Sequence, residues 1–235
     1  MSKVSVVLAT YNRSALVGKA VESVLHQPYT DLELVVVNDS STDNTKEVVA
    51  RYAQKDPRVV LVNNTENLGQ VKSLNKGIAK ARGKYIARID DDDIWFTSDK
   101  LEKQIGFLEA HPEYVLVGGG IVVVNGQGKE VVRFLHPKED QDIRKQMLIS
   151  PPFAHGSVVF RKDAYVSVGG YNETMEYGED WDLWLKLGKV GKLHNVQDYV
   201  LQYRRAGDRK TANWKNETKY DNALRRAYRH DYPNY

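Results

Sequence analysis

The stretch KYIARIDDDDIW (84–95) decides both the fold and the place of the site in this chain. Its first part, KYIARI, is rich in β-branched and aromatic residues and predicts a buried strand. Four aspartates, Asp90 to Asp93, follow that strand directly. Neighbouring carboxylates repel one another by roughly 1 kcal/mol per pair at about 4 Å in water. A divalent cation such as Mg²⁺, Mn²⁺ or Ca²⁺ would relieve this repulsion, and a solvated acidic turn is the alternative interpretation.

Three more strand-like runs precede this stretch, and helical patterns separate them. Residues 16–25 and 71–81 each place apolar side chains on one helix face, and the second pattern stops at Gly83. Ser40 to Asp43 supply cap candidates for a further helix between them. This alternation predicts an α/β fold with a mostly parallel, Rossmann-like central sheet and helices on both faces. The runs are VSVVLA (4–9), LELVVVN (32–38) and RVVLVN (58–63).

Polar residues follow three of the four predicted strands at the point where each strand ends. Thr10-Tyr11-Asn12-Arg13 come after the first strand, Asp39-Ser40 after the second and Asp90–Asp93 after the fourth. Ligands of open α/β sheets bind beyond the carboxyl ends of the strands. We therefore expect the three polar clusters to converge on one edge of the sheet.

The pattern after the aspartates is looser. It predicts a helix over 98–110, a long strand over YVLVGGGIVVV (114–124) and a hairpin at the Gly126–Gly128 turn. A second strand, GSVVFR (156–161), and a tryptophan-rich helix from about residue 179 follow. These segments add a small antiparallel element to the sheet. Because the chain has no linker, repeat or low-complexity stretch, we expect residues 1–235 to form a single domain.

Composition and charge exclude several classes of function. The formal charge of +3 is too small to predict nucleic-acid binding. The chain has no cysteine, which excludes disulfides and thiolate metal sites and fits a reducing cytoplasm. No apolar run is long enough to span a membrane, and the N-terminus does not resemble a signal peptide. We therefore expect a cytoplasmic protein.

The last part of the chain, 206–235 with the residues just before it, is basic and aromatic. Such a tail suits contact with anionic lipid headgroups at the inner face of the membrane, or with an anionic acceptor. A solvated helix face is the alternative. The basic residues are Arg204, Arg205, Arg209, Lys210, Lys215, Lys219, Arg225, Arg226 and Arg229, and the aromatic ones are Trp214, Tyr220, Tyr228, Tyr232 and Tyr235.

Two further groups of residues have the chemistry of a site. Lys72 and Arg88 could pair with phosphate, or could simply lie on the surface. The segment GEDWDLWLKL (178–187) places Glu179 and Asp180 in a first helical turn, where acids complement the helix dipole. Near apolar tryptophans, a carboxylate could instead have its pKa raised toward that of a general base. The chain has no P-loop, no GxGxxG after the first strand and no HExxH, so those phosphate, dinucleotide and zinc sites are not expected.

The order of these motifs resembles that of the family 2 inverting glycosyltransferases, which have the nucleotide-diphospho-sugar transferase fold called GT-A. The resemblance covers about residues 3–205. It implies a metal-dependent enzyme that moves a sugar from a nucleotide-diphosphate donor, a UDP-sugar, to a hydroxyl of a glycan or lipid-linked acceptor. It also implies a donor-binding half over 1–95 and an acceptor-binding half over 96–205. The motifs are SVVLATYNR, VVVNDSSTDNT, NLGQVKSLNKGIAKARGKYIARIDDDDIW, GSVVFRKDAYVSVGGYNE and GEDWDLWLKL.

The resemblance also implies roles for residues of the donor half. It places one group around the nucleoside, assigns an acid to the uracil ring, and places a third group along the border of the nucleotide. It places the first acids of the aspartate run at the ribose or the sugar. In that order, the residues are Thr10, Tyr11 and Arg13; Asp39; Lys72, Asn75 and Gly77; and Asp90 and Asp91. Arg88, just before the aspartate run, is a further candidate for contact with the phosphate of the nucleotide.

The aspartate run resembles the DxD motif, whose last acid holds Mn²⁺ or Mg²⁺. Because all four positions are Asp, the register is open: Asp92 is the first candidate for the metal and Asp90 the next. Asp180 resembles the general base that deprotonates the acceptor, with Glu179 as the alternative. Attack from the opposite face of the sugar would give inversion, by a logic related to that of inverting glycosidases. His155, Tyr171 and Tyr177 are acceptor-side candidates.

One departure from the family pattern concerns the segment after Tyr203. Many relatives carry a histidine shortly after the Tyr-Arg pair, and this chain has none there. Arg204 or Arg205 could bind phosphate instead, or Asp208 could join the metal site. Two other functions stay open: a sugar-phosphate nucleotidyltransferase, and a non-catalytic module that binds sugar nucleotides or glycans. A nucleotidyltransferase would carry a glycine-rich loop after the first strand, and Thr10–Arg13 contains no glycine.

Overall fold

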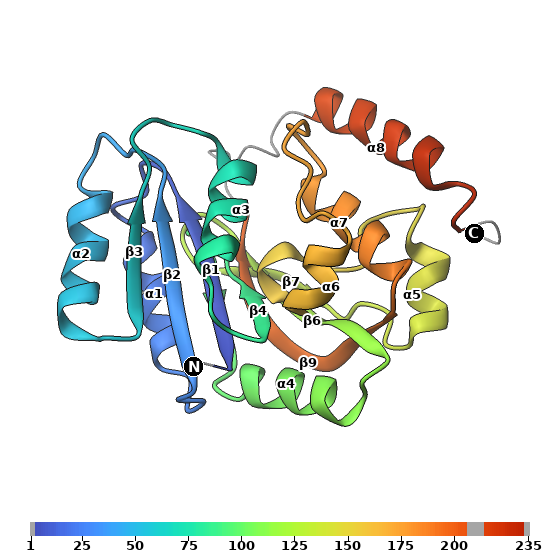
Figure 1. The fold of residues 1–235 in the computed structure, drawn as a ribbon, viewed down its shortest axis with the longest axis horizontal. Coiled ribbons are helices and arrows are strands. Elements are labelled where there is room, and N and C mark those ends of the chain that lie inside the picture. Colours follow the sequence, from blue (N-terminus) through green and yellow to red (C-terminus); the bar gives the residue numbers. More distant parts are fainter. Residues whose placement is uncertain (1–2, 206–213, 233–235) are drawn as a thin grey trace.

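The computed structural model describes residues 3–205 and 214–232. Within these ranges one nine-stranded sheet runs through the molecule in the order β3-β2-β1-β4-β8-β6-β9-β5, with β7 paired to β6 (Figure 1). The strands are β1 (Val4–Thr10), β2 (Leu32–Asn38), β3 (Val59–Asn63), β4 (Tyr85–Arg88), β5 (Ile94–Trp95), β6 (Tyr114–Val124), β7 (Glu130–Phe134), β8 (Val159–Arg161) and β9 (Lys192–Arg204).

Helices cover both faces of this sheet, which confirms the predicted α/β class. Their bounds are α1 (Val17–Leu25), α2 (Thr45–Lys55), α3 (Gln70–Lys80), α4 (Lys100–Ala110), α5 (Asp140–Gln146), α6 (Lys162–Ser167), α7 (Glu179–Gly188) and α8 (Trp214–Tyr228), with a 3₁₀ turn, η1, at His155–Ser157. None of the helices in the described ranges has the length and apolar character needed to cross a membrane.

The four N-terminal predicted strands are parallel and in register. Thr10 at the end of β1 lies beside Asn38 at the end of β2, and Asn38 lies beside Asn63 at the end of β3. On the other side of β1, Val7 lies beside Arg88, the last residue of β4. The carboxyl ends of these strands therefore meet at one edge, as the sequence predicts.

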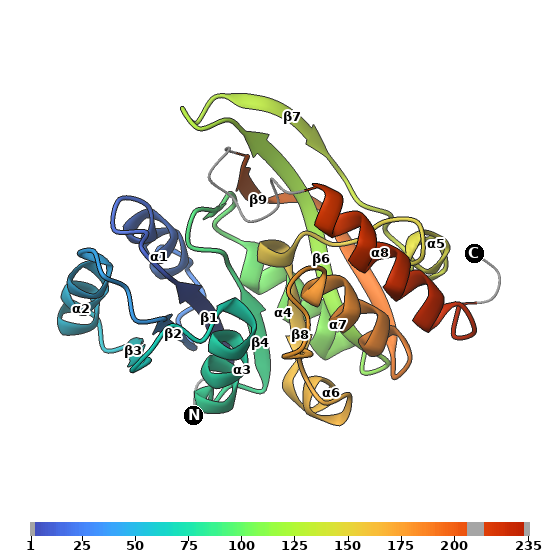
Figure 2. The ribbon, with the colours of Figure 1, turned by 90° about the horizontal axis from the view of Figure 1, so that it is seen from above.

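The second half continues the same sheet with mixed directions. β8 is antiparallel to both β4 and β6, and the predicted β6–β7 hairpin is present. β6 then runs parallel to β9, a 13-residue strand that the sequence patterns did not predict. In Figure 2 the β6–β7 hairpin projects from the body of the molecule, beyond the end of β9.

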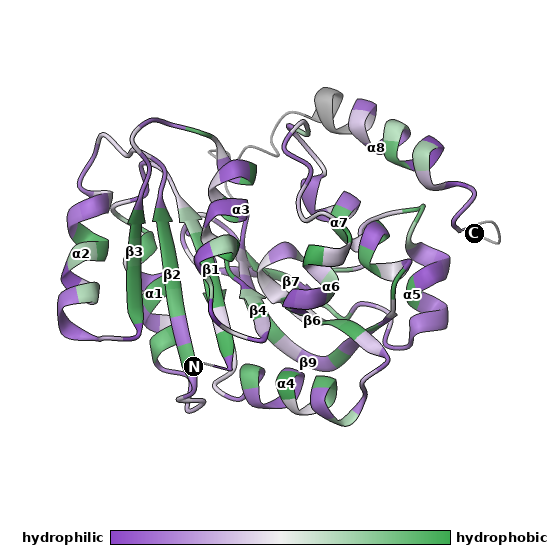
Figure 3. Ribbon diagram, viewed as in Figure 1, coloured by the Kyte–Doolittle hydropathy of each residue, from purple (hydrophilic) through white to green (hydrophobic). Residues whose placement is uncertain are grey.

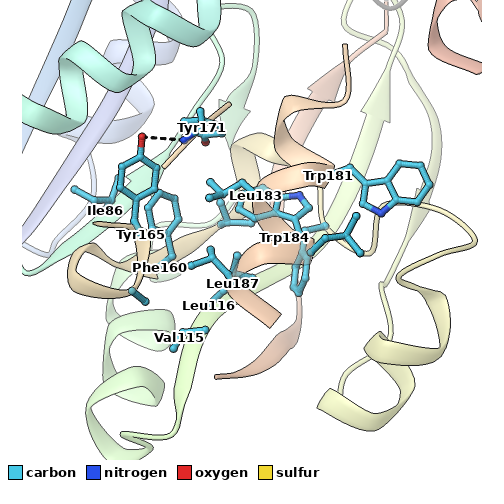
Figure 4. Packing of buried hydrophobic residues seen from close by; sticks show 14 of the residues in the cluster. Ile86, Val115, Leu116, Phe160, Tyr165, Tyr171, Trp181, Leu183, Trp184 and Leu187 are labelled. Carbon is cyan, nitrogen blue, oxygen red and sulfur yellow. Dashed lines mark hydrogen bonds between the residues drawn. The ribbon is translucent and has the colours of Figure 1, made fainter. Parts of the chain in front are cut away.

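Two hydrophobic cores fill the two faces of the sheet. Alternate residues of β1 point to opposite faces, so Val7 joins one core while Val6 and Leu8 join the other. The first core lies under α3, α6, α7 and α8, and the second lies under α1, α2 and α4. Figure 3 shows the apolar strands between helices whose outer surfaces are hydrophilic. Figure 4 shows the tryptophans of α7 in the first core.

Candidate functional site

The loops after β1 and β2 are joined at the carboxyl edge by Asn12. Its side-chain Oδ1 accepts a hydrogen bond from the Thr42 N–H at 2.8 Å, and its own N–H donates to Ser41 Oγ at 3.0 Å. Asn12 and Ser40 both have positive φ, +53° and +60°. Such φ values are uncommon outside glycine and cluster at functional sites. Both residues belong to the polar clusters predicted at the strand ends, but their backbone conformation was not predicted, although Asn in a post-strand turn is a signal for it.

Residues 10–13 lie where the sequence predicts, beside the aspartates. Thr10 is buried at the end of β1, and Tyr11 is exposed. The Arg13 Nε lies 3.8 Å from Asp91 Oδ1. The predicted nucleoside segment and the aspartate run therefore adjoin each other.

Asp39 is buried and organises a loop of the protein. Its carboxylate accepts hydrogen bonds from Asn64 Nδ2 at 2.7 Å and from the N–H groups of Leu68 and Gly69, each at 2.8 Å. Only 3% of the residue is exposed. This carboxylate fixes the path from β3 to α3, whereas its contact with a uracil ring stays a prediction.

The three predicted residues of α3 have different surroundings. Lys72 is exposed, and its contact with a nucleotide stays a prediction. Asn75 Nδ2 donates to the Tyr171 carbonyl at 3.0 Å and to Glu173 Oε1 at 2.9 Å. Gly77 faces the sheet: a Cβ there would lie 2.7 Å from a Val7 methyl carbon. The structure gives Gly77 a role in packing, and its contact with the nucleotide stays a prediction.

Asp90 and Asp91 are held by two arginines. Arg88 Nη2 donates to Asp90 Oδ1 at 2.6 Å. Burial and the charges of the neighbouring aspartates raise the pKa of Asp91 to about 7, although the Thr10 hydroxyl and Arg13 act in the opposite direction. Burial is the largest cause of this rise in the pKa of Asp91, and the neighbouring aspartates add to it.

Asp92 and Asp93 face the end of β9. Asp92 Oδ2 lies 3.6 Å from Arg204 Nη1, and the Arg204 N–H donates to Asp93 Oδ1 at 2.9 Å. Asp93 is 1% exposed. The Asp92 side chain is also buried, at 5% exposed, whereas the side chains of Asp90 and Asp91 are 18% and 16% exposed. Burial alone therefore does not separate Asp92 from Asp93 as a ligand. Arg204, which is predicted as a phosphate ligand, lies beside Asp92. Asp208, the other candidate in this segment, lies outside the described residues.

The donor set at this edge fits Mn²⁺ or Mg²⁺ that arrives with a diphosphate. In the described part of the chain, no three His, Cys, Asp or Glu side chains form a group able to hold a metal by themselves. Mg²⁺ commonly binds through one or two carboxylates and completes its shell with substrate phosphates and water. The carboxylates of Asp90 to Asp92 are the residues at this edge that could supply that share.

The second acidic pair begins α7. The N-cap position is Gly178, with φ of +72°, and Glu179 and Asp180 form the first turn. Asp180 Oδ1 accepts the Trp181 N–H at 2.7 Å. Burial, and then the Glu179 charge, raise the pKa of Asp180 to about 7, and the Asp90 charge adds to this effect. The fold thus brings α7 and the aspartate run close enough for their carboxylates to influence each other.

The predicted acceptor-side residues separate into two groups. The partly buried His155 and the buried Tyr171 form a pair, with Tyr171 Oη 2.6 Å from His155 Nε2. Tyr177 lies in the loop before α7, where its ring is 5.6 Å from that of Tyr220 on α8. Arg205 is exposed, and its N–H donates to the Val124 carbonyl.

The tail is partly a packed helix. Leu224 and Tyr232 are buried in the first core, while Lys219, Arg226 and Arg229 are exposed. Arg209, Lys210 and Tyr235 lie outside the described residues, as do the side chains of Trp214 and Lys215. Contact of this tail with lipid stays a prediction.

Comparison with known proteins gives the family. The model of "Glycosyl transferase family 2" matches residues 5–169. The putative glycosyltransferase EpsE of Bacillus subtilis is 36% identical over 210 residues, which cover 88% of this chain and 74% of EpsE. The amylovoran biosynthesis glycosyltransferase AmsE of Erwinia amylovora is 35% identical over 208 residues, covering 87% of this chain and 77% of AmsE.

Solved structures with this fold include two sugar-nucleotide complexes. S. aureus TarS 1–349 with UDP-GlcNAc has a TM-score of 0.74 at 20% identity, over 90% of this chain and 61% of TarS 1–349. The mannosyltransferase PcManGT of Pyrobaculum calidifontis, with GDP-Man and Mn²⁺, has a TM-score of 0.72 at 22% identity, over 96% of this chain and 63% of PcManGT. The chain thus spans about three fifths of these solved chains, and the likeness shows the GT-A fold. By its sequence match and its relatives, the chain belongs to glycosyl transferase family 2.

Proposed function

We propose that this protein is a metal-dependent, inverting glycosyltransferase that transfers a sugar from a UDP-sugar to a hydroxyl of a glycan or lipid-linked acceptor. One observation carries the proposal. The aspartate run after β4 lies close enough to the acidic first turn of α7 for the Asp90 charge to help raise the pKa of Asp180 to about 7. A donor site and a base for the acceptor therefore adjoin each other.

Asp180 is the proposed general base. A base works best when its pKa is close to the working pH, because it is then largely deprotonated yet still accepts a proton readily. The partly buried Asp180 has a pKa of about 7, which agrees with this condition, and Glu179 beside it is the alternative. The proton of the acceptor hydroxyl would pass to the carboxylate as the oxygen attacks the sugar. Attack from the face opposite the leaving diphosphate gives inversion.

Asp92, with Asp90 as the alternative, is the proposed ligand of Mn²⁺ or Mg²⁺. Such a cation, when bound, would stabilise the negative charge that develops on the departing diphosphate. Arg13 and Arg204 stand beside Asp91 and Asp92, where they add positive charge for phosphate oxygens. Lys72 is exposed on α3 and can reach the same ligand.

The choice of donor rests on structural neighbours. TarS binds UDP-GlcNAc, and PcManGT was solved with GDP-Man and Mn²⁺. The TarS complex supports a UDP-sugar as the donor, and the PcManGT complex supports a divalent cation. A role in polysaccharide synthesis agrees with AmsE, which is named for amylovoran biosynthesis.

The test is a panel of UDP- and GDP-sugars with Mn²⁺, measured by thermal shift and by release of the nucleoside diphosphate. We expect Asp92→Ala to abolish the Mn²⁺-dependent shift and the release. Asp180→Asn should keep the shift and lower turnover by about 10²–10⁴-fold. Asp142→Asn, at an exposed acid of α5, is the control. Full turnover in Asp180→Asn would refute the base, and release of pyrophosphate would indicate a nucleotidyltransferase.

A further inference from the structure

Arg88 is a buried cation beside the aspartate run, and the protein itself uses its hydrogen bonds. The residue is 1% exposed. Its Nη1 donates to the carbonyls of Val7 at 2.8 Å and Ile89 at 2.5 Å, and its Nη2 donates to Asp90 Oδ1 at 2.6 Å. A buried guanidinium is costly unless it is paired and hydrogen-bonded in this way. These contacts orient Arg88 toward Asp90 and away from a direct role in binding phosphate.

The remaining edge of the guanidinium rests on His155. Arg88 Nε donates to His155 Nε2 at 3.1 Å, and Tyr171 Oη lies 2.6 Å from the same nitrogen. Arginine has only donors, so this nitrogen must be the unprotonated acceptor of a neutral imidazole. Burial, and then the Arg88 charge, lower the pKa of His155 to about 3, which agrees with the neutral form. His155 and Tyr171 therefore support Arg88 without adding charge.

Tyr171 is in turn anchored to α3. Its carbonyl accepts from Asn75 Nδ2 at 3.0 Å. Its N–H donates to Tyr165 Oη at 3.3 Å (Figure 4). The Tyr165 hydroxyl also bonds Asn75 Oδ1. The His155 ring packs edge-on against Trp184 of α7, with ring centroids 5.9 Å apart. The contacts that begin at Asp90 thus reach both the α3 side of the site and the helix that carries Asp180.

We infer that Arg88 is a positioning residue that holds Asp90 in the orientation needed for the metal–diphosphate site, and that His155 and Tyr171 hold Arg88 in place. This inference rests on the proposed function. The orientation of Asp90 is then set by buried contacts before the ligand arrives, and pre-organisation of this kind improves affinity. It also gives His155 and Tyr171 a place behind the donor site instead of at the acceptor.

The inference separates donor binding from turnover. Without the Tyr171 hydroxyl, His155 loses a donor and Arg88 loses part of its support, but Asp180 keeps its own contacts. We expect Tyr171→Phe to weaken binding of UDP with Mn²⁺ about three- to tenfold and to raise the donor KM by the same factor. The kcat at saturating donor should stay within about threefold of that of the wild type. Arg88→Lys cannot reproduce the fork of donors and should weaken binding more than tenfold.

The experiment measures the Kd of UDP and of GDP in Mn²⁺ by calorimetry, together with kcat, donor KM and Tm. Tyr85→Phe is the matched control, because Tyr85 is a buried tyrosine at the other end of β4. It should leave the Kd unchanged whatever it does to Tm. Equal Kd values for wild type and Tyr171→Phe would overturn the inference. If Arg88→Lys does not fold, the Kd of Tyr171→Phe is by itself the test of the inference. A wild type that binds neither nucleotide would refute the proposed donor site and the inference with it.

Discussion

At the scale of single residues, Asp180 makes pH a direct probe of the mechanism. Burial and the Glu179 charge raise its pKa to about 7. Below that pH the carboxyl is protonated and cannot accept a proton from the acceptor, so activity is lost as pH falls. We expect kcat at saturating donor to fall about tenfold per pH unit below 7 and to level off above it. A kcat that stays constant from about pH 5.5 to 8.5 would contradict the role of Asp180.

Asp39 offers a second test at this scale. Its carboxylate either stabilises the loop from β3 to α3 or binds the uracil ring of the donor. Asp39→Ala would leave Asn64 Nδ2 and the N–H groups of Leu68 and Gly69 without their acceptor. Buried donors that lose their partners cost about 1–3 kcal/mol each, so we expect a loss of roughly 2–5 kcal/mol in urea unfolding. Asp198→Asn, at an exposed acid, should change stability by less than about 0.5 kcal/mol. Unchanged stability in Asp39→Ala, with loss of UDP binding alone, would favour the uracil role.

These residues show how far a sequence predicts a site. Parallel strands in register end at the same edge of a sheet. The sequence could therefore predict that Thr10, Arg13 and Asp90–Asp93 lie close together. The partners of Asp39 could not be predicted in the same way. They come from a loop whose path depends on Gly69, at φ of +83°. The hydrogen bonds of Arg88 to Asp90 and His155 could not be predicted either, because His155 comes from a distant part of the chain.

At the scale of elements, α3 lies unusually close to the sheet, and Gly77 makes this possible. A Cβ at Gly77 would lie 2.7 Å from Val7 Cγ1 and 2.9 Å from Val37 Cγ2. We expect Gly77→Ala to lower the free energy of unfolding, because overpacking costs about 1–3 kcal/mol and exceeds a helix-propensity gain of about 0.5–1 kcal/mol. Gly106→Ala in α4 is the control: it has no neighbour within 4 Å and should gain that propensity. Equal stabilisation of both variants in urea unfolding would contradict the packing argument.

β9 shows why some elements escape prediction. Its sequence, KLHNVQDYVLQYR, mixes polar and apolar residues without a clear alternation. The strand is defined by its long parallel pairing with β6, whose glycines permit close approach. A Cβ at Gly119 would lie 2.7 Å from Val200 Cγ2. A pairing of this kind joins residues about 80 positions apart, as in Gly119 with Val196, and local patterns carry no information about it.

At the scale of the whole molecule, β8 joins the two halves of the fold. It lies between β4 and β6 and is antiparallel to both, so the parallel N-terminal strands continue into the β6–β9 pair within one sheet. The Arg88 N–H, moreover, donates to the Val158 carbonyl just before β8. The aspartates after β4 are therefore joined to the second half of the fold through the same sheet. The strand order could not be derived from the sequence, because alternation predicts neighbours in the chain and not insertions in the sheet.

α8 packs against α7, so weakening this contact should loosen α7, which carries Asp180. Leu224 is buried, Tyr228 Oη donates to Asp182 Oδ1 at 2.7 Å, and Tyr232 Oη donates to the Leu185 carbonyl at 2.7 Å. We expect Leu224→Ala to cost about 2–4 kcal/mol and to speed hydrogen exchange at the amides of α7, with a smaller effect in α1. Arg226→Ala, at an exposed residue two positions away, should leave both unchanged. Exchange in α7 that stays at the wild-type rate in Leu224→Ala would show that α7, and Asp180 with it, is held without help from α8.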